Sequence, residues 1–97
     1  MKSLEEIKEI IRQHKDKLRE RFYVREIGIF GSYIRGEQKE DSDVDILVEF
    51  EKPVSLLQIV SLEIYLTDIL GIKADVVPKK NIREELKEII LKEAIPI

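Results

Sequence analysis

The sequence predicts an α/β (α+β) fold, a small mixed sheet of about three strands with helices mainly on one face. Three segments, residues 25–31, 44–50 and 72–77, are short and rich in β-branched residues, as strands are. Longer segments around them carry apolar residues at helical spacing. The chain has 97 residues, enough for one core, so we expect a single domain that covers residues 1–97.

The first expected element is a helix that begins at Ser3. Ser3 and Glu6 have the spacing of a capping box, in which each side chain binds a backbone N–H group at the helix start. One face of this helix then carries a stripe at intervals of three and four residues: Leu4, Ile7, Ile11, His14 and Leu18. Because His14 lies on the apolar stripe, we expect it to be packed or at the rim of the core, not catalytic.

Two predicted strands follow, one that ends in a glycine-serine turn and one with two chemically different faces. The strand at residues 25–31 stops at Gly31 and Ser32. The strand at residues 44–50 alternates, and its apolar face consists of Val44, Ile46, Val48 and Phe50. Asp43 and Asp45 fall on the other face. One side of this strand is therefore suited to a core, and the other presents carboxylates near its start.

The second half of the chain predicts helix, strand and helix. Ser55 begins a helix that Gly71 ends, and its apolar residues are too many for a single stripe, so it can be apolar on two faces. Pro78 stops the strand at residues 72–77. Asn81 has cap spacing for the last helix, whose expected buried face is Ile82, Leu86, Ile89 and Ile90.

Composition excludes several classes of function. The absence of Cys excludes disulfide scaffolds, zinc–thiolate sites and thiol catalysis, and a single His makes a histidine-based triad improbable. No apolar run approaches the ~20 residues of a membrane span, so we expect a cytoplasmic protein without a membrane partner. Residues 37–51 carry seven acidic side chains against Lys39, the opposite of the basic stripe that direct binding of duplex DNA needs. Such a stretch is either a solvated loop or a cation site.

Three aspartates favour the cation site. Asp43 and Asp45 point to the same side of a strand, with their Cβ atoms about 6.5–7 Å apart at ~3.3 Å rise per residue. Carboxylates without His or Cys suit two Mg²⁺ ions, with Mn²⁺ as the alternative. Asp75 lies mid-strand, where an unpaired acid is disfavoured. If its strand neighbours residues 44–50, Asp75 can join the pair; otherwise it is an edge residue that faces water.

A glycine-serine turn precedes the aspartates. Gly31 lets a phosphate approach the backbone closely, and the Ser32 hydroxyl and nearby N–H groups can point at its oxygens. An ordinary strand-ending turn would look the same. A P-loop does not fit, because Glu37 and Gln38 stand where its Lys and Ser or Thr are required. An EF-hand does not fit either, because Ile46 replaces its glycine.

Taken together, Gly31-Ser32-x-x-Arg35-Gly36, then Ser42-Asp43-x-Asp45, then Asp75 resemble the nucleotidyltransferases of the DNA polymerase β superfamily. The length is similar to that of the minimal nucleotidyltransferase (MNT, or MntA-like) family, and the resemblance covers essentially the whole chain. It implies the nucleotidyltransferase fold and a single minimal domain. It also implies that Asp43, Asp45 and Asp75 are catalytic and bind metal. The nucleotide would contact four further residues: Gly31, Ser32, Arg35 and Ser42.

The resemblance also implies a reaction and partners. A nucleoside monophosphate, AMP from ATP or the equivalent from another NTP, would pass to a hydroxyl of a partner protein, a tyrosine of a HEPN-domain toxin, and the chain would act as an antitoxin. Two alternatives stay open. The chain could neutralise its partner by binding alone, or it could modify a small molecule. The second apolar side of the helix at residues 55–70 could also hold a partner or a second copy in a homo-oligomer.

Overall fold

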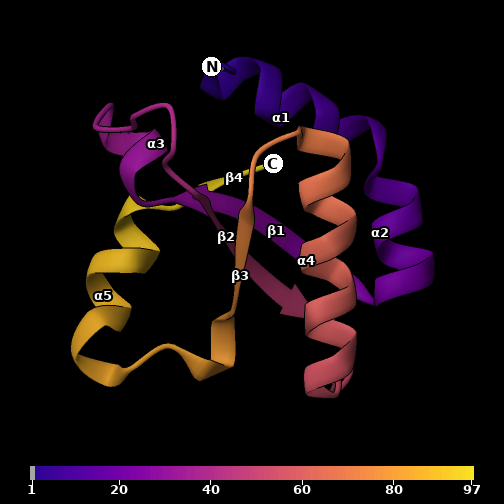
Figure 1. Ribbon diagram of the computed structural model, residues 1–97. Coiled ribbons are helices and arrows are strands. Elements are labelled where there is room, and N and C mark those ends of the chain that lie inside the picture. The colour runs from indigo at the N-terminus through magenta and orange to yellow at the C-terminus, as the bar shows by residue number, and fades with distance from the viewer. Residues whose placement is uncertain (1) are drawn as a thin grey trace.

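The structure is a computed structural model that describes residues 2–97. Its elements follow the predicted order (Figure 1). The helices are α1 (Leu4–Gln13), α2 (Lys15–Phe22), α3 (Ser32–Arg35), α4 (Leu56–Leu70) and α5 (Glu84–Glu93), with a 3₁₀ turn, η1 (Lys79–Asn81). The strands are β1 (Val24–Phe30), β2 (Val44–Phe50), β3 (Ala74–Pro78) and β4 (Ile95–Pro96).

The sheet is mixed and has the strand order β3-β2-β1-β4. β1 runs antiparallel to β2 and β4, whereas β2 and β3 are parallel and are joined through α4. The prediction of a mixed α/β sheet is confirmed, but the sheet has four strands instead of about three. β4 has only two residues, too few to leave an alternating pattern in the sequence.

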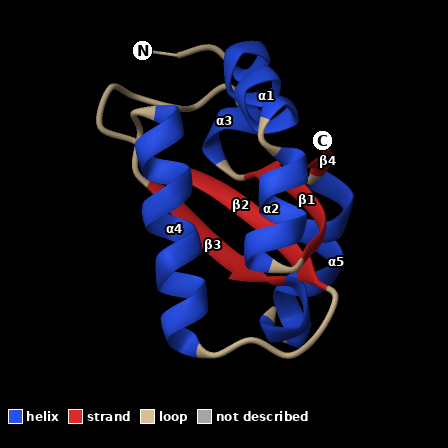
Figure 2. Cartoon of the chain, turned by 90° about the vertical axis from the view of Figure 1, so that its right-hand side faces the viewer, coloured by secondary structure: helices blue, strands red, loops and turns tan. Residues whose placement is uncertain are grey.

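One face of the sheet carries the core. Helices α1, α2 and α4 cover this face, with α4 and α2 in front of the strands in Figure 2. The Ser3–Glu6 capping box is present at the start of α1, and Ser55 and Gln58 form a second one at α4. The fully buried aliphatic side chains include residues of these helices and of the inner face of β1 and β2: Ile7, Ile11, Leu18, Ile29, Val44, Ile46, Val48, Leu62, Leu66 and Leu70.

The last helix lies on the opposite face of the sheet, behind the strands in Figure 2. A small cavity is lined by Leu47 and Gly28 of the sheet and by Leu91 of α5. Because α5 covers only part of this face, none of the four residues of the predicted buried face is fully buried. Ile82 and Ile90 are half-buried, whereas Leu86 is 45% exposed and Ile89 is 62% exposed. The cap at Asn81 was also wrong, since Asn81 belongs to η1 and Arg83 precedes the helix without a side-chain cap.

The predicted first helix is two helices that meet at His14. The His14 backbone (φ −108°, ψ 8°) leaves the helical region and ends α1 before α2 begins. The side chain is half-buried, its Nδ1 lies 2.8 Å from the carbonyl oxygen of Ile10, and its ring meets Tyr65 edge-on at 5.9 Å. The expectation of a histidine packed at the rim of the core is therefore confirmed.

Helix α4 is apolar on two sides, as its sequence indicates. Leu62, Leu66 and Leu70 are buried against the sheet, whereas a second row of apolar side chains is exposed: Leu56, Leu57, Val60 and Ile64. No helix within residues 2–97 combines the length and the apolar character that crossing a membrane requires.

Candidate active site

The three aspartates meet on the outer face of the sheet, where β2 and β3 begin. Asp45 lies on β2 and is the register partner of Asp75 on β3. Residues paired in register on neighbouring strands point to the same side, and Asp43, two residues before Asp45, shares that side. The structure thus places Asp75 with the other two carboxylates and away from the face that carries the core.

The carboxylates are close enough to affect one another's ionisation. Burial raises the pKa of Asp45 above its ordinary value, and the charges of Asp75 and Asp43 raise it further. Burial also raises the pKa of Asp75, with the Asp43 charge as the next cause. Lys73 Nζ, 4.0 Å from an Asp43 carboxylate oxygen, offsets part of this negative charge. Without a cation, the cluster stores electrostatic repulsion.

Gly31 brings the backbone against Asp45. Its φ of +83° is unfavourable for residues with a side chain. A Cβ atom at this position would lie 2.1 Å from Asp45 Oδ2, well inside the distance that two such atoms tolerate. The turn and the aspartate are therefore built to fit each other, and only glycine satisfies both the backbone and the contact.

The predicted turn after Gly31 is the short helix α3. Gly31 is its N-cap residue, and the Gly31 carbonyl accepts hydrogen bonds from the N–H groups of Ile34 and Arg35. Ser32 opens the helix and is half-buried. The first two N–H groups of α3, those of Ser32 and Tyr33, have no carbonyl partner within the helix, so they can meet an anion beside the carboxylates.

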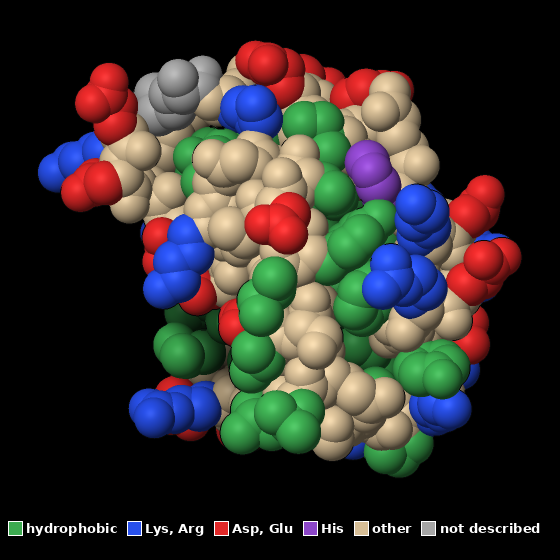
Figure 3. Space-filling view, turned by 45° about the vertical axis from the view of Figure 1, so that its right-hand side comes forward, with side chains coloured by type: hydrophobic (Ala, Val, Ile, Leu, Met, Phe, Trp, Pro, Cys, Tyr) green, Lys and Arg blue, Asp and Glu red, His purple; other side chains and the backbone are tan. Residues whose placement is uncertain are grey.

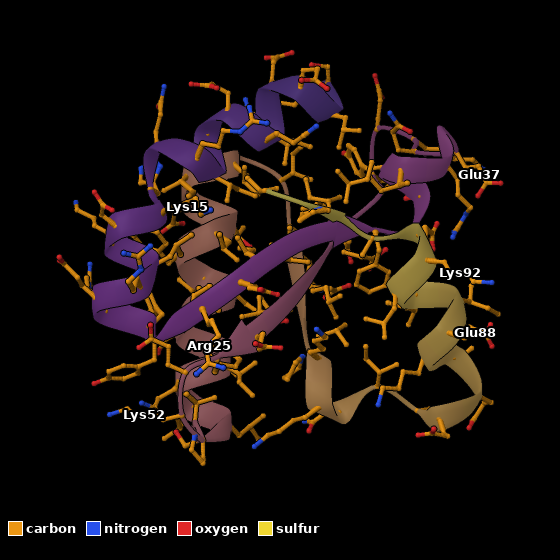
Figure 4. The ribbon with its side chains drawn as sticks, turned by 180° about the vertical axis from the view of Figure 1, so that it is seen from behind. Lys15, Arg25, Glu37, Lys52, Glu88 and Lys92 are labelled. Carbon is orange, nitrogen blue, oxygen red and sulfur yellow. The ribbon has the colours of Figure 1, made fainter. Side chains whose placement is uncertain are left out.

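Arg35 and Ser42 make other contacts than the predicted ones. Arg35 donates hydrogen bonds to Glu37 (2.7 Å) and to Glu93 (2.6 Å), so it joins α3 to α5. Figure 4 shows Glu37 at the α3 end of the molecule, beside α5. The Ser42 hydroxyl accepts a hydrogen bond from the backbone N–H of Lys39 and shapes the loop before Asp43. Contact of either residue with a nucleotide stays a prediction.

Sequence reasoning missed two glutamates near the aspartates. The negative charge of Glu93 contributes to the raised pKa of Asp45, and Glu63 has the same effect on Asp75. Glu63 also accepts a hydrogen bond from the backbone N–H of Val76 at 2.8 Å. Neither residue belongs to a local motif, and each reaches the site only through the packing of its helix.

The donor chemistry fits a hard divalent cation. Among residues 2–97, no three His, Asp or Glu side chains stand together as a complete set of ligands for one metal ion. Mg²⁺ usually binds through one or two carboxylates, with water and substrate phosphates as its other ligands, so it does not need such a cage. The oxygen donors of Asp43, Asp45 and Asp75, and their mutual repulsion, match that mode of binding.

The chain is similar to known proteins in sequence and in fold. Residues 11–97 match the nucleotidyltransferase domain family. MntA of Thermococcus cleftensis, a protein adenylyltransferase, is 54% identical over 95 residues, which are 98% of this chain and 96% of that protein. The solved structure of a minimal nucleotidyltransferase has 36% identity and a TM-score of 0.82, covering 99% of this chain and 97% of that one.

A more distant structure shares the fold. It is the complex of a tri-AMPylated HEPN toxin with an MNT antitoxin from Shewanella oneidensis, with 20% identity and a TM-score of 0.65 over 93% of this chain and 66% of that one. The family match and the identity to MntA extend over most or all of the chain. The chain therefore belongs to the nucleotidyltransferase family, in its minimal, MntA-like group, and is an enzyme of that class.

Proposed function

We propose that this chain transfers AMP from ATP to a tyrosine hydroxyl of a HEPN-domain toxin and thereby acts as its antitoxin. One observation carries the proposal: Asp45 and Asp75 are register partners on one face of the sheet, with Gly31 packed against Asp45. Protein adenylylation by the Thermococcus cleftensis relative and the AMP-modified toxin of the Shewanella oneidensis complex support the choice of donor and acceptor.

The chain's own groups would hold the substrates. The Gly31 turn would lie against the triphosphate, and the backbone N–H groups and hydroxyl at Ser32 would donate hydrogen bonds to its oxygens. Asp43, Asp45 and Asp75 would bind two Mg²⁺ ions, with Mn²⁺ as a substitute, and Mg²⁺ supplies neutralisation of the negative charge around the α-phosphate. Arg35 and Ser42 would support the loops on either side.

The reaction exchanges one phosphorus–oxygen bond for another. The tyrosine oxygen attacks the α-phosphorus and forms a new P–O bond, while the bond from that phosphorus to the oxygen of the β-phosphate breaks and pyrophosphate leaves. Asp75 would accept the proton that the hydroxyl loses.

The test is transfer of label from α-labelled ATP to a HEPN-domain acceptor in the presence of Mg²⁺. Asp43→Asn and Asp45→Asn should each lower the rate by about 100-fold or more, because each removes a charge that acts at the reacting phosphate. Asp41→Asn is the matched control, since Asp41 is an exposed acid of the same loop. Its rate should stay near that of the unmodified chain. Parallel reactions with GTP, CTP and UTP report the preferred nucleotide.

The same experiment separates the two alternatives. Tight binding that neutralises the toxin without labelling, and that survives Asp43→Asn and Asp45→Asn, would identify an antitoxin that acts by binding alone. Label that appears only on a small molecule would identify an enzyme of a different substrate class. Either result would contradict the proposal.

A further inference from the structure

A second hollow lies at the other end of the sheet from the carboxylates. It has a volume of about 410 Å³ and opens where β2 and β3 end, between the start of α4 and η1. Its apolar lining includes Phe50, Val54, Ile59 and Pro78. This volume lies in the range of pockets that receive a ligand or an anchoring side chain, about 300–1,000 Å³. Hereafter it is the basic pocket.

The basic pocket has more positive than negative side chains. Its lining includes four lysines, Lys52, Lys79, Lys80 and Lys87, and two glutamates, Glu49 and Glu51. This local excess of positive charge contrasts with the formal charge of −3 for the whole chain. In Figure 4, Lys52 lies where β2 leads into α4, far from Glu37 at the α3 end. The chain is thus acidic at one end of the sheet and basic at the other.

The chain uses only part of this positive charge itself. Lys79 pairs with Glu49 at 3.3 Å, and Lys52 lies over the ring of Tyr23 at 3.8 Å. Lys80 and Lys87 form no ion pair within residues 2–97. These two ammonium groups are therefore available to an acidic ligand.

Exposed apolar side chains extend the surface beyond the basic pocket. Leu56, one helical turn before Ile59, is 75% exposed, and its neighbour Leu57 is 78% exposed. The row continues along α4 through Val60 and Ile64, visible as hydrophobic side chains down one line of Figure 3. This apolar surface is larger than a small molecule needs, and it lies next to lysines. Such a surface is typical of a site that docks another protein.

We infer that the basic pocket docks an acidic segment of the acceptor protein, with an apolar side chain of that segment inserted among Phe50, Val54 and Ile59. The inference rests on the proposed function for the identity of the acceptor. Asp45 and Phe50 are five residues apart on β2, about 17 Å at ~3.3 Å per residue. Because Phe50 and Asp45 point to opposite faces of the sheet, an acceptor that contacts both would reach around β3, which is an edge strand. A protein interface of ordinary size, about 800 Å² on each side, is large enough for this.

The experiment measures binding of the HEPN-domain acceptor by titration calorimetry. The variant Lys80→Glu/Lys87→Glu should weaken binding by about tenfold or more and raise KM with kcat nearly unchanged, because the two charges lie far from the aspartates. Lys17→Glu/Arg19→Glu reverses two exposed positive charges of α2 and is the matched control. Val54→Trp fills the same pocket without a change of charge and should also weaken binding. Thermal melting checks that each variant is folded.

The outcomes distinguish this inference from the proposed function. Binding of the acceptor without any labelling contradicts AMP transfer. In that case the dissociation constants of the variants, compared with that of the unmodified chain, still show whether the basic pocket is the docking site. No binding by the unmodified chain, or equal binding by all variants, overturns the docking site. A further measurement is chemical acetylation of the lysines with and without ATP. If ATP alone, without the acceptor, protects Lys80 and Lys87 from acetylation, the docking site is overturned, since a nucleotide would then be the occupant.

Discussion

Gly31 is the residue at which backbone conformation and site chemistry are most tightly linked. Gly31→Ala adds a Cβ atom that would meet Asp45 Oδ2 at 2.1 Å, at a φ of +83°. With its ψ of −151°, this backbone conformation is adopted almost only by glycine and costs about 1–3 kcal/mol for a residue with a side chain. We expect a larger loss in the free energy of unfolding than this, measured by denaturant titration, together with a loss of AMP transfer, because Asp45 must move.

Gly36 offers the matched control. Its φ is +72°, but a Cβ atom there would have nothing within 4 Å. Gly36 lies in the left-handed helical region, so Gly36→Ala should show a backbone cost of about 1–2 kcal/mol without the loss of transfer. Equal transfer rates for Gly31→Ala and Gly36→Ala would show that the fit between Gly31 and Asp45 has no bearing on activity.

The raised pKa of Asp45 predicts a pH dependence of stability in the metal-free protein. Folding favours the protonated form of a group whose pKa is raised. Its favourable contribution is complete below the ordinary aspartate pKa, about 3.9, and is lost as the pH rises through the higher pKa of the folded state. In EDTA, Asp45→Asn should gain stability relative to the unmodified chain as the pH rises from about 4 to 7.

Melting curves of the two proteins over this pH range are the measurement. Asp41→Asn, which removes an exposed acid, should melt in parallel with the unmodified chain. A difference between Asp45→Asn and the unmodified chain that is the same at every pH would contradict the assigned burial and repulsion.

For single residues, the sequence correctly predicted the face of a strand on which a side chain lies, because short-range periodicity determines it. A strand period of two placed Asp43 and Asp45 on one face, away from the core, and the structure agrees. The ion pair of Arg35 with Glu93 could not be predicted, because Glu93 is 58 residues away and meets Arg35 only through the position of α5. The same holds for Glu63, which approaches Asp75 across the packing of α4 on β3.

Among the elements, α5 is joined to α3 by an ion pair of Arg35 with Glu93. Glu93, whose side chain is 15% exposed, accepts a hydrogen bond from Arg35, as does Glu37, which is 63% exposed. Glu93→Gln should lower the free energy of unfolding by about 1 kcal/mol, since a charged hydrogen bond is weakened in a partly buried place. Glu37→Gln should have almost no effect, as exposed pairs contribute little. Equal effects in denaturant titrations would contradict this difference.

The elements that sequence reasoning found are those with long patterns or caps. The 15 residues of α4 have a capping box at Ser55 and a glycine at its end, and both ends were predicted within a residue or two. The break at His14 carries no Gly or Pro, and β4 has two residues, so neither leaves a local signal. The exposure of Leu86 and Ile89 depends on how much of the sheet α5 covers, which periodicity does not report.

The molecule as a whole has two chemically different ends. Aspartates gather where β2 and β3 begin, and lysines gather where the same two strands end. A parallel strand pair therefore supports both the candidate site and the basic pocket, and α4, which joins the two strands, exposes its second apolar row beside them. Because the aspartates lie on the outer face of the sheet and α4 lies on the other face, a protein acceptor that contacts both would reach around the β3 edge.

The central claim is that Asp75 acts with Asp43 and Asp45 in AMP transfer, and the rate of transfer by Asp75→Asn tests it most directly. Asparagine keeps the shape of the side chain but has neither the charge nor the ability to accept the proton. Asp68→Asn, a change of an exposed acid on α4, is the matched control. The account predicts a loss of about 100-fold or more for Asp75→Asn and none for Asp68→Asn. Equal rates for the two folded variants would contradict it.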